Sequence, residues 1–205
     1  MTGTFLSAIY LFGLLFAEGL RLPHRINRLR NRKAWSGAKD VQRASEWLVL
    51  GMVILGIWIL PLIHTFTPWL AAFDYQLPDW TIWPAVLLFG SSLALRWAAQ
   101  RKLAEHWSFT LETASGHILI QDGIYAFTRH PIYFSLIFWA VAQALLLQNL
   151  LAGFGGAVAV LLIWLIRVPR EEQMMVAVFG EQYRVYSLRT GRFYPHRKSK
   201  HRAGV

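Results

Sequence analysis

The sequence contains five long runs that carry almost no charge. Each core run is about 16 to 20 residues long, near the lower end of the ~17–25 residues that a helix needs to cross a bilayer. In a soluble chain of 205 residues, so many apolar runs would leave too little polar surface to cover them. We therefore predict an all-α fold, a polytopic integral membrane bundle of about five transmembrane helices. The runs occupy residues 2–20, 47–73, 80–95, 131–147 and 150–166.

The last two runs are nearly continuous. Between Pro131 and Ile166, only Gln143, Gln148 and Asn149 are strongly polar. At about 1.5 Å per residue, this stretch of 36 residues is too long for a single crossing. We expect two antiparallel spans that are joined by a tight turn at Gln148-Asn149.

The 21 lysines and arginines all lie outside the uncharged runs. Eight fall within 21–45, four within 96–130 and nine within 167–202, and the other connecting segments have none. Five crossings place all three basic segments on one side, and an excess of Lys and Arg marks the cytoplasmic side. We predict an N-terminus outside and a C-terminus and active site in the cytoplasm, at the inner membrane if the source is bacterial. The net charge of +10 therefore needs no nucleic-acid partner.

The connecting segments divide the chain into three parts. Residues 1–95 hold the first three spans and the basic loop 21–45, which either contacts anionic lipid or acts only as a topology signal. Residues 96–195 form the predicted functional region, because the loop 96–130 is long and too aromatic for a disordered linker. Residues 196–205 are a basic tail that we expect to meet membrane lipids.

A cytoplasmic helix is expected after the fifth span. Pro169 predicts a kink or the first turn of a new helix, since proline is tolerated in a helix without strain only there. Apolar and aromatic residues recur with helical spacing from Glu171 onward, and Gly180 predicts a break in this amphipathic helix.

Three motifs in order carry a resemblance to a known family. They are "GHILIQDGIYAFTRHPIYFS", then the two-span hairpin, then "RVPREEQMMVAVFGEQYRVY". Together they resemble the isoprenylcysteine carboxyl methyltransferase (ICMT) family and its phospholipid methyltransferase relatives, over about residues 96–195. The resemblance implies a membrane enzyme that transfers a methyl group from S-adenosylmethionine to a lipophilic acceptor, which enters sideways from the bilayer. Residues 96–195 would then be the methyltransferase catalytic region.

The resemblance also implies site residues. Arg167 matches an arginine that faces the methyl acceptor, and Glu171 matches a cofactor-binding glutamate, so both are catalytic candidates. Thr110 stands where the eukaryotic enzymes have a cofactor-binding glutamine, and Ile124 replaces a common proline. The implied cofactor contacts are His117, Ile118, Leu119, Ile120, Tyr125, His130, Pro131, Ile132, Tyr133 and Glu171.

The chemistry of these residues suits the same cofactor. Aliphatic and aromatic side chains at 117–125 offer faces for an adenine, Glu171 offers a carboxylate, and His130 with the main-chain amides after Pro131 offers donors for the carboxylate of S-adenosylmethionine. Methyl transfer needs positioning but no metal and no covalent intermediate. The chain has no cysteine, which excludes thiolate metal ligands and a Cys nucleophile. Arg167 would neutralise and orient a carboxylate acceptor.

Structural interpretations of the same residues remain open. Arg129 and Arg167 could extend toward the aqueous side at the membrane edge, and His130 with Pro131 could simply start a helix. Glu171 and Glu172 could be first-turn acids that favour the helix dipole. Tyr183 and Tyr186 are expected to pack rather than to take part in chemistry.

Two other functions also remain open. One is an NADPH-dependent sterol-type membrane reductase, which shares an R-H-x-x-Y run and a tyrosine-rich tail, although such enzymes typically have Asn where Ile132 stands. The other is a non-catalytic membrane scaffold. The sequence leaves the methyl acceptor open between a prenyl-cysteine carboxylate, an amino-lipid, an isoprenoid acid and a small thiol.

Overall fold

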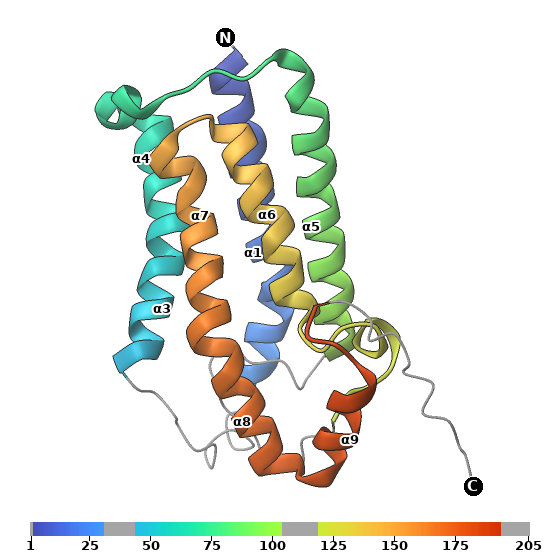
Figure 1. Ribbon diagram of the computed structural model, residues 1–205. Coiled ribbons are helices and arrows are strands. Elements are labelled where there is room, and N and C mark those ends of the chain that lie inside the picture. Colours follow the sequence, from blue (N-terminus) through green and yellow to red (C-terminus); the bar gives the residue numbers. More distant parts are fainter. Residues whose placement is uncertain (1, 31–43, 104–118, 194–205) are drawn as a thin grey trace, which may run out of the picture.

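The computed structural model describes residues 2–30, 44–103 and 119–193, and within these ranges every regular element is a helix. Five long helical rods stand side by side (Figure 1). The first three are α1 (Thr2–Arg30), the continuous rod of α3 (Ala44–Ile54), a π-helical turn (Leu55–Ile59) and α4 (Leu60–Phe66), and α5 (Ile82–Leu103). Short 3-10 turns at Pro68–Phe73 and Asp79–Thr81 connect α4 to α5.

The second half of the chain forms the other two rods. They are α6 (Pro131–Leu147), which follows a 3-10 turn at Gly123–Ala126, and the rod of α7 (Leu150–Leu162), a π-helical turn (Ile163–Arg167) and α8 (Val168–Phe179). The short helix α9 (Glu181–Arg189) follows after a break at Gly180. The predicted all-α bundle is confirmed, and so are the first-turn position of Pro169 and the break at Gly180.

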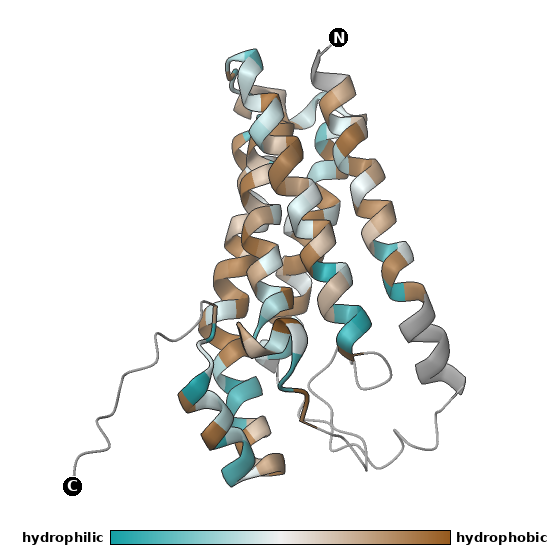
Figure 2. Cartoon of the chain, turned by 90° about the vertical axis from the view of Figure 1, so that its right-hand side faces the viewer, coloured by the Kyte–Doolittle hydropathy of each residue, from teal (hydrophilic) through white to brown (hydrophobic). Residues whose placement is uncertain are grey.

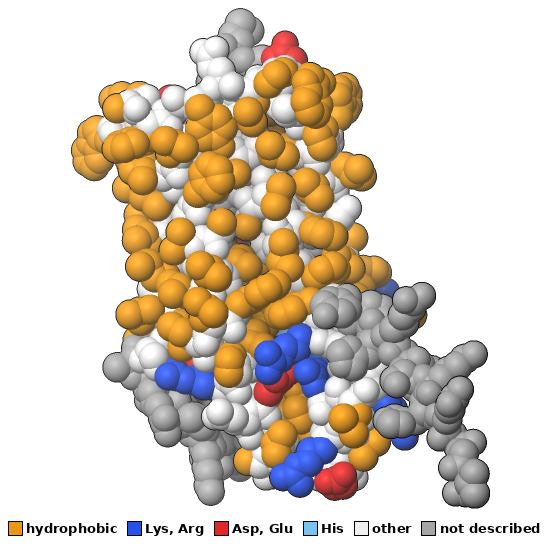
Figure 3. Space-filling view, viewed as in Figure 1, with side chains coloured by type: hydrophobic (Ala, Val, Ile, Leu, Met, Phe, Trp, Pro, Cys, Tyr) orange, Lys and Arg blue, Asp and Glu red, His pale blue; other side chains and the backbone are white. Residues whose placement is uncertain are grey.

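The outer surface of the bundle is that of an integral, multi-pass membrane protein. Four helical segments are long and apolar enough to cross a bilayer, Phe5–Leu22, Ser45–Phe66, Asp79–Leu103 and Leu150–Phe179, and the shorter apolar helix Pro131–Leu147 packs among them. Figure 3 shows hydrophobic side chains over most of this face, with the Lys and Arg side chains gathered toward one end and an acidic group at the other. Figure 2 shows the same division, since hydrophilic residues collect at the end where α8 and α9 lie.

The last rod reaches beyond the bilayer. Leu150–Phe179 contains 30 residues. At ~1.5 Å per residue such a helix is about 45 Å long, whereas the hydrocarbon core is about 30 Å thick. We therefore place α8 outside the apolar layer, where it carries the charged residues of the candidate site.

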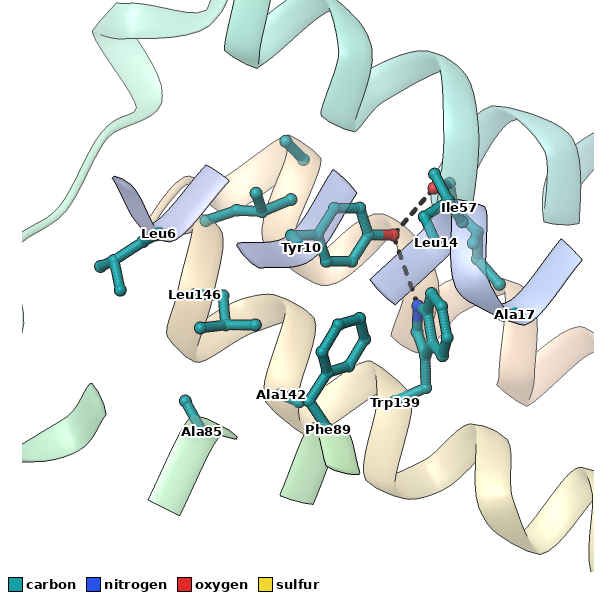
Figure 4. Close-up of a cluster of buried hydrophobic side chains, with 12 residues drawn as sticks. Leu6, Tyr10, Leu14, Ala17, Ile57, Ala85, Phe89, Trp139, Ala142 and Leu146 are labelled. Carbon is teal, nitrogen blue, oxygen red and sulfur yellow. Dashed lines mark hydrogen bonds between the residues drawn. The ribbon is translucent and has the colours of Figure 1, made fainter. Parts of the chain in front are cut away.

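A polar network holds the apolar bundle together. The Tyr10 hydroxyl of α1 donates a hydrogen bond to Ile57 O at 2.8 Å and lies 3.1 Å from Gln143 Oε1 of α6. The Gln143 amide donates to Gly56 O at 2.8 Å and to Ala152 O at 2.6 Å. Trp139 packs edge-on against Tyr10, as Figure 4 shows. Because bilayer lipid offers no hydrogen bonds, these internal partners fix the order of the helices.

The turn between α6 and α7 agrees with the prediction. Gln148 adopts φ 47°, a left-handed conformation that ends α6. The Asn149 side-chain oxygen accepts hydrogen bonds from the amides of Leu151 and Ala152, which caps α7. The Asn149 amide also donates to Leu70 O at 2.8 Å, so the turn is attached to the connection between α4 and α5.

We predict that the crossing of the α3–α4 rod and α7 depends on two glycines. A Cβ atom on Gly56 would lie 2.2 Å from Gly155 O, a main-chain atom that cannot move aside. Gly56→Ala should therefore lower the free energy of unfolding by about 1–3 kcal/mol, the usual cost of overpacking. The control Gly51→Ala meets nothing within 4 Å. Thermal unfolding in detergent measures both, and equal melting temperatures for the two variants would contradict the prediction.

Candidate active site

The candidate site lies at the charged end of the bundle, where α6 begins and α8 and the C-terminal segment meet it. Glu172 of α8 is its electrostatic centre, because three basic side chains surround one carboxylate. Arg129 Nη2 lies 2.9 Å from Glu172 Oε1, Arg192 Nη2 lies 2.6 Å from Oε2, and His130 Nε2 lies 3.4 Å from Oε1. Glu172 is mostly buried, with 13% of its side chain exposed.

The pKa of Glu172 shows which of these effects is larger. Burial by itself would raise the pKa of this carboxyl. Hydrogen bonds from His130 and Arg192 and the charge of Arg129 outweigh burial and lower the pKa to about 2. Glu172 is therefore ionised at neutral pH and holds three segments of the chain together.

Main-chain hydrogen bonds fix the Arg-His-Pro motif from the other side. The amides of Arg129 and His130 donate to Gly191 O at 2.9 Å and to Arg192 O at 3.2 Å. The Thr128 hydroxyl also donates to Arg192 O, at 2.6 Å. Pro131 then starts α6, where its missing amide costs no helical hydrogen bond. The motif is thus clamped between α8 and the segment after α9.

Glu171, the residue before Glu172 on α8, belongs to a second polar cluster. The Tyr133 hydroxyl donates a 2.6 Å hydrogen bond to Glu171 Oε2. Arg167, which is only 8% exposed, interacts with Tyr133, Glu171 and the buried Glu46 at the start of α3. Arg170 reaches the same end of α3, where its guanidinium contacts Ser45 and lies 3.6 Å from Glu46. Two acids on different helices therefore offset the charge of Arg167.

Tyrosines form the wall between α5 and α9. Tyr125 is buried, and its hydroxyl lies 3.5 Å from Ala99 O of α5. The Tyr186 hydroxyl donates to Tyr125 O at 2.6 Å, and Tyr183 packs edge-on against Tyr186. Burial raises the pKa of Tyr125 and Tyr186, so both hydroxyls stay neutral. The interpretation of Tyr183 and Tyr186 as packing residues agrees with their burial.

The structure brings part of the predicted site together. His130, Tyr133, Arg167 and Glu171 gather where α6 meets α8, and the rings of His130 and Tyr133 stack at 5.5 Å. Pro131 is buried beside them, Ile132, Leu119 and Ile120 are half-buried, and Tyr125 is buried against α5. The predicted contacts at His117 and Ile118, and the substituted position Thr110, lie outside the described residues. Their roles toward a cofactor stay predictions.

The structure also changes the expected environment of some residues. His130 was expected to donate to a cofactor carboxylate, but its Nε2 faces Glu172 and its amide is bonded to Arg192 O. Sequence reasoning treated Glu172 as a possible first-turn acid and missed Glu46 and Arg192. The adjacent acids in "REEQ" were a signal for Glu172, since α8 directs Glu171 and Glu172 to different partners.

Comparison with known proteins shows what this part of the chain is similar to. Residues 85–177 match the sequence model of the isoprenylcysteine carboxyl methyltransferase (ICMT) family. The predicted resemblance to this family is confirmed. Similar relatives are named protein-S-isoprenylcysteine O-methyltransferase: the Tribolium castaneum protein is 32% identical over 41% of this chain, and the Homo sapiens protein is 32% identical over 38% of it. The chain matches only 30% and 28% of the length of these two relatives.

The fold agrees over a longer range. The solved structure of the eukaryotic intramembrane Ras methyltransferase ICMT matches 91% of this chain and 65% of that chain, with a TM-score of 0.60. The sequence identity over this match is 19%. The structural match therefore supports a shared membrane fold that extends beyond residues 96–195, the range of the sequence resemblance.

We predict that Glu172→Gln destabilises the site at neutral pH. The variant keeps the shape of the side chain but removes the charge that holds Arg129, His130 and Arg192. Glu172→Gln should lower the free energy of unfolding by about 1–3 kcal/mol at pH 7, since hydrogen bonds to charged groups are lost. The lowered pKa of Glu172 stabilises the fold above pH 4.5, and this contribution disappears as the pH falls toward about 2. The difference between native protein and variant should shrink over that interval.

Thermal unfolding between pH 7 and pH 3 checks this expectation. Glu181→Gln is the matched control, because Glu181 pairs only with exposed Arg184 at 3.4 Å among the described residues. A loss in Glu172→Gln that does not depend on pH, or an equal loss in Glu181→Gln, would show that the charge of Glu172 is not responsible.

Proposed function

We propose that the chain is a membrane methyltransferase that uses S-adenosylmethionine and methylates the carboxylate of a lipophilic acceptor, as in an isoprenylated cysteine. The observation that carries the proposal is the buried Arg167, which interacts with Tyr133 and Glu171 where the fifth rod leaves the apolar layer. A buried arginine at this depth suits an acceptor whose tail stays in lipid while its carboxylate reaches the polar end. The names of the similar relatives support an O-methyl product.

The residues present fit this cofactor. S-adenosylmethionine carries an adenine, an ammonium, a carboxylate and a sulfonium. Glu171 supplies a carboxylate for a positive or hydroxyl group, and the rings of His130 and Tyr133 supply aromatic faces. Arg129 Nε and Trp164 Nε1 are buried donors without a hydrogen-bond partner among the described residues. When bound, the cofactor supplies a methyl group activated by the sulfonium.

The proposed residues bind, orient and exclude water. A carboxylate acceptor is already a nucleophile at neutral pH, so the site needs no general base, and rate depends on alignment. Arg167 holds the acceptor carboxylate with its planar fork of donors. Tyr133 keeps the Glu171 carboxylate in one position through its hydrogen bond. The Arg129–Glu172–Arg192 cluster closes the polar end of the site.

Purified protein in lipid nanodiscs tests the proposed function directly. The protein is incubated with cofactor that carries a labelled methyl group and with an S-farnesylcysteine whose amine is blocked. The expected product is a methyl ester, which releases labelled methanol in base. An amide of the same carboxyl group is the control acceptor and should take no label. Binding of NADPH, without binding of S-adenosylhomocysteine, would favour the reductase instead.

We predict different effects for the two candidate catalytic residues. Glu171→Gln should raise the dissociation constant of S-adenosylhomocysteine at least tenfold, about 1.4 kcal/mol. Arg167→Lys should leave that constant within about twofold and lower kcat/KM for the carboxylate acceptor at least tenfold, because the bidentate fork is lost. Calorimetry and initial rates measure the two effects, with Glu181→Gln as control. The reverse pattern would exchange the two roles.

We further propose that the charged end of the bundle faces the cytoplasm. All 21 lysines and arginines belong to segments on that side of the predicted crossings. Since the chain has no cysteine, single cysteines report on topology without background. Gln76→Cys and Gln182→Cys both lie at exposed positions at opposite ends. In intact cells an impermeant maleimide should label only Gln76→Cys, and labelling of Gln182→Cys alone would invert the orientation.

A further inference from the structure

Two buried polar side chains of α5 have no function in the site described above. Arg96 is 4% exposed and Gln100 is 1% exposed, so both side chains point into the bundle. They lie four residues apart and so share one face of α5. Arg96 Nε and both amide atoms of Gln100 are buried without a hydrogen-bond partner in the described part of the chain.

The face that carries them lies at the junction of α1, α5 and α6. The Arg96 guanidinium lies 5.9 Å from the centre of the Trp139 ring. Trp139 in turn packs against Tyr10 of α1 and Phe89 of α5. At the next turn toward the polar end, Ala99 O faces the Tyr125 hydroxyl at 3.5 Å. Arg96 and Gln100 are therefore inside the bundle, on the α5 side of α6, whereas Arg167 approaches α6 from α7.

Two other buried polar side chains inside the bundle, Ser92 and Gln143, do have hydrogen-bond partners. Ser92, one turn before Arg96 on α5, donates to Ser135 O at 2.7 Å. The Gln143 amide donates to two carbonyls, Gly56 O and Ala152 O. A buried guanidinium with an unused donor is costly in a low-dielectric interior, and no acidic side chain among the described residues is in ion-pair contact with it. Such a group inside a membrane bundle indicates a binding site.

We propose that Arg96 and Gln100 bind the oxyanion head of an amphiphile, a carboxylate or a phosphate, inside the bundle. Arg96 supplies the charge and an N–H donor, and the Gln100 amide supplies a second donor one turn nearer the polar end. The apolar side chains of Trp139 and Phe89 lie beside this pair. The inference does not depend on the proposed methyl transfer, since it concerns different residues on a different helix.

Three amphiphiles with the same chain length test the head group. Dodecanoate, dodecyl phosphate and dodecanol are titrated into the full-length protein in nanodiscs of zwitterionic lipid, with calorimetry as the readout. At least one of the two anions should bind at least tenfold more tightly than dodecanol, and the tighter of the two identifies the head group. Equal binding of all three would overturn the proposal, because a purely apolar site does not distinguish them.

Variants then assign the binding to this pair. Arg96→Met should weaken binding of the anion at least tenfold, and Gln100→Leu should weaken it severalfold, with little effect on dodecanol. Arg101→Met is the control, since Arg101 is exposed on the same helix and stacks on Trp97 at 5.2 Å. A control that weakens anion binding as much as Arg96→Met would place the anion at the surface and overturn the proposal.

A stability measurement separates a binding site from a structural role. Removal of an unpaired buried charge should leave the melting temperature of the ligand-free protein unchanged or higher. The same substitution should abolish the rise in melting temperature that the anion produces in the native protein. If Arg96→Met unfolds the protein, Gln100→Leu provides the same comparison. Lower stability without ligand in both variants, with anion binding retained, would mean that the pair is structural.

Discussion

The polar groups inside this bundle cannot form hydrogen bonds with lipid, and the arrangement of the helices depends on that constraint. Gln143 illustrates it best, because one side chain of α6 bonds carbonyls of the α3–α4 rod and of α7 and lies beside Tyr10 of α1. The close approach of Gly56 and Gly155 belongs to the same junction. Apolar packing alone would allow the helices to rotate, since lipid is as apolar as leucine. The polar contacts select one arrangement.

At the charged end, ion pairs take the place of these hydrogen bonds. There Glu172 joins the segment before α6, the segment after α9 and α8 itself, three parts that are distant in sequence. Glu171, its neighbour, bonds Tyr133 instead. Glu172 thus holds the Arg-His-Pro motif, whereas Glu171 interacts with Tyr133 and Arg167. Neighbouring residues of a helix can have such different partners because their side chains point about 100° apart.

Sequence reasoning found the spans because an uncharged run has few alternatives to a membrane helix. It misjudged their ends: α1 continues to Arg30 and α5 to Leu103, since a helix tolerates charge once it leaves the apolar layer. The run 47–73 includes a 3-10 turn, because Thr67 and Pro68 end the helix there. The site was harder. The resemblance to the family implied Arg167 and Glu171, but the partners of Glu172 depend on tertiary contacts that no local pattern encodes.

Glu46 adds a condition to the proposed chemistry. It is buried at the start of α3, close enough to interact with Arg167, while Arg170 lies 3.6 Å from its carboxylate. Arg167 therefore has compensating charge before any acceptor arrives, which lowers the cost of keeping a guanidinium in this place. In the proposed function, the acceptor carboxylate would approach an arginine whose charge is already offset by Glu46 and Glu171.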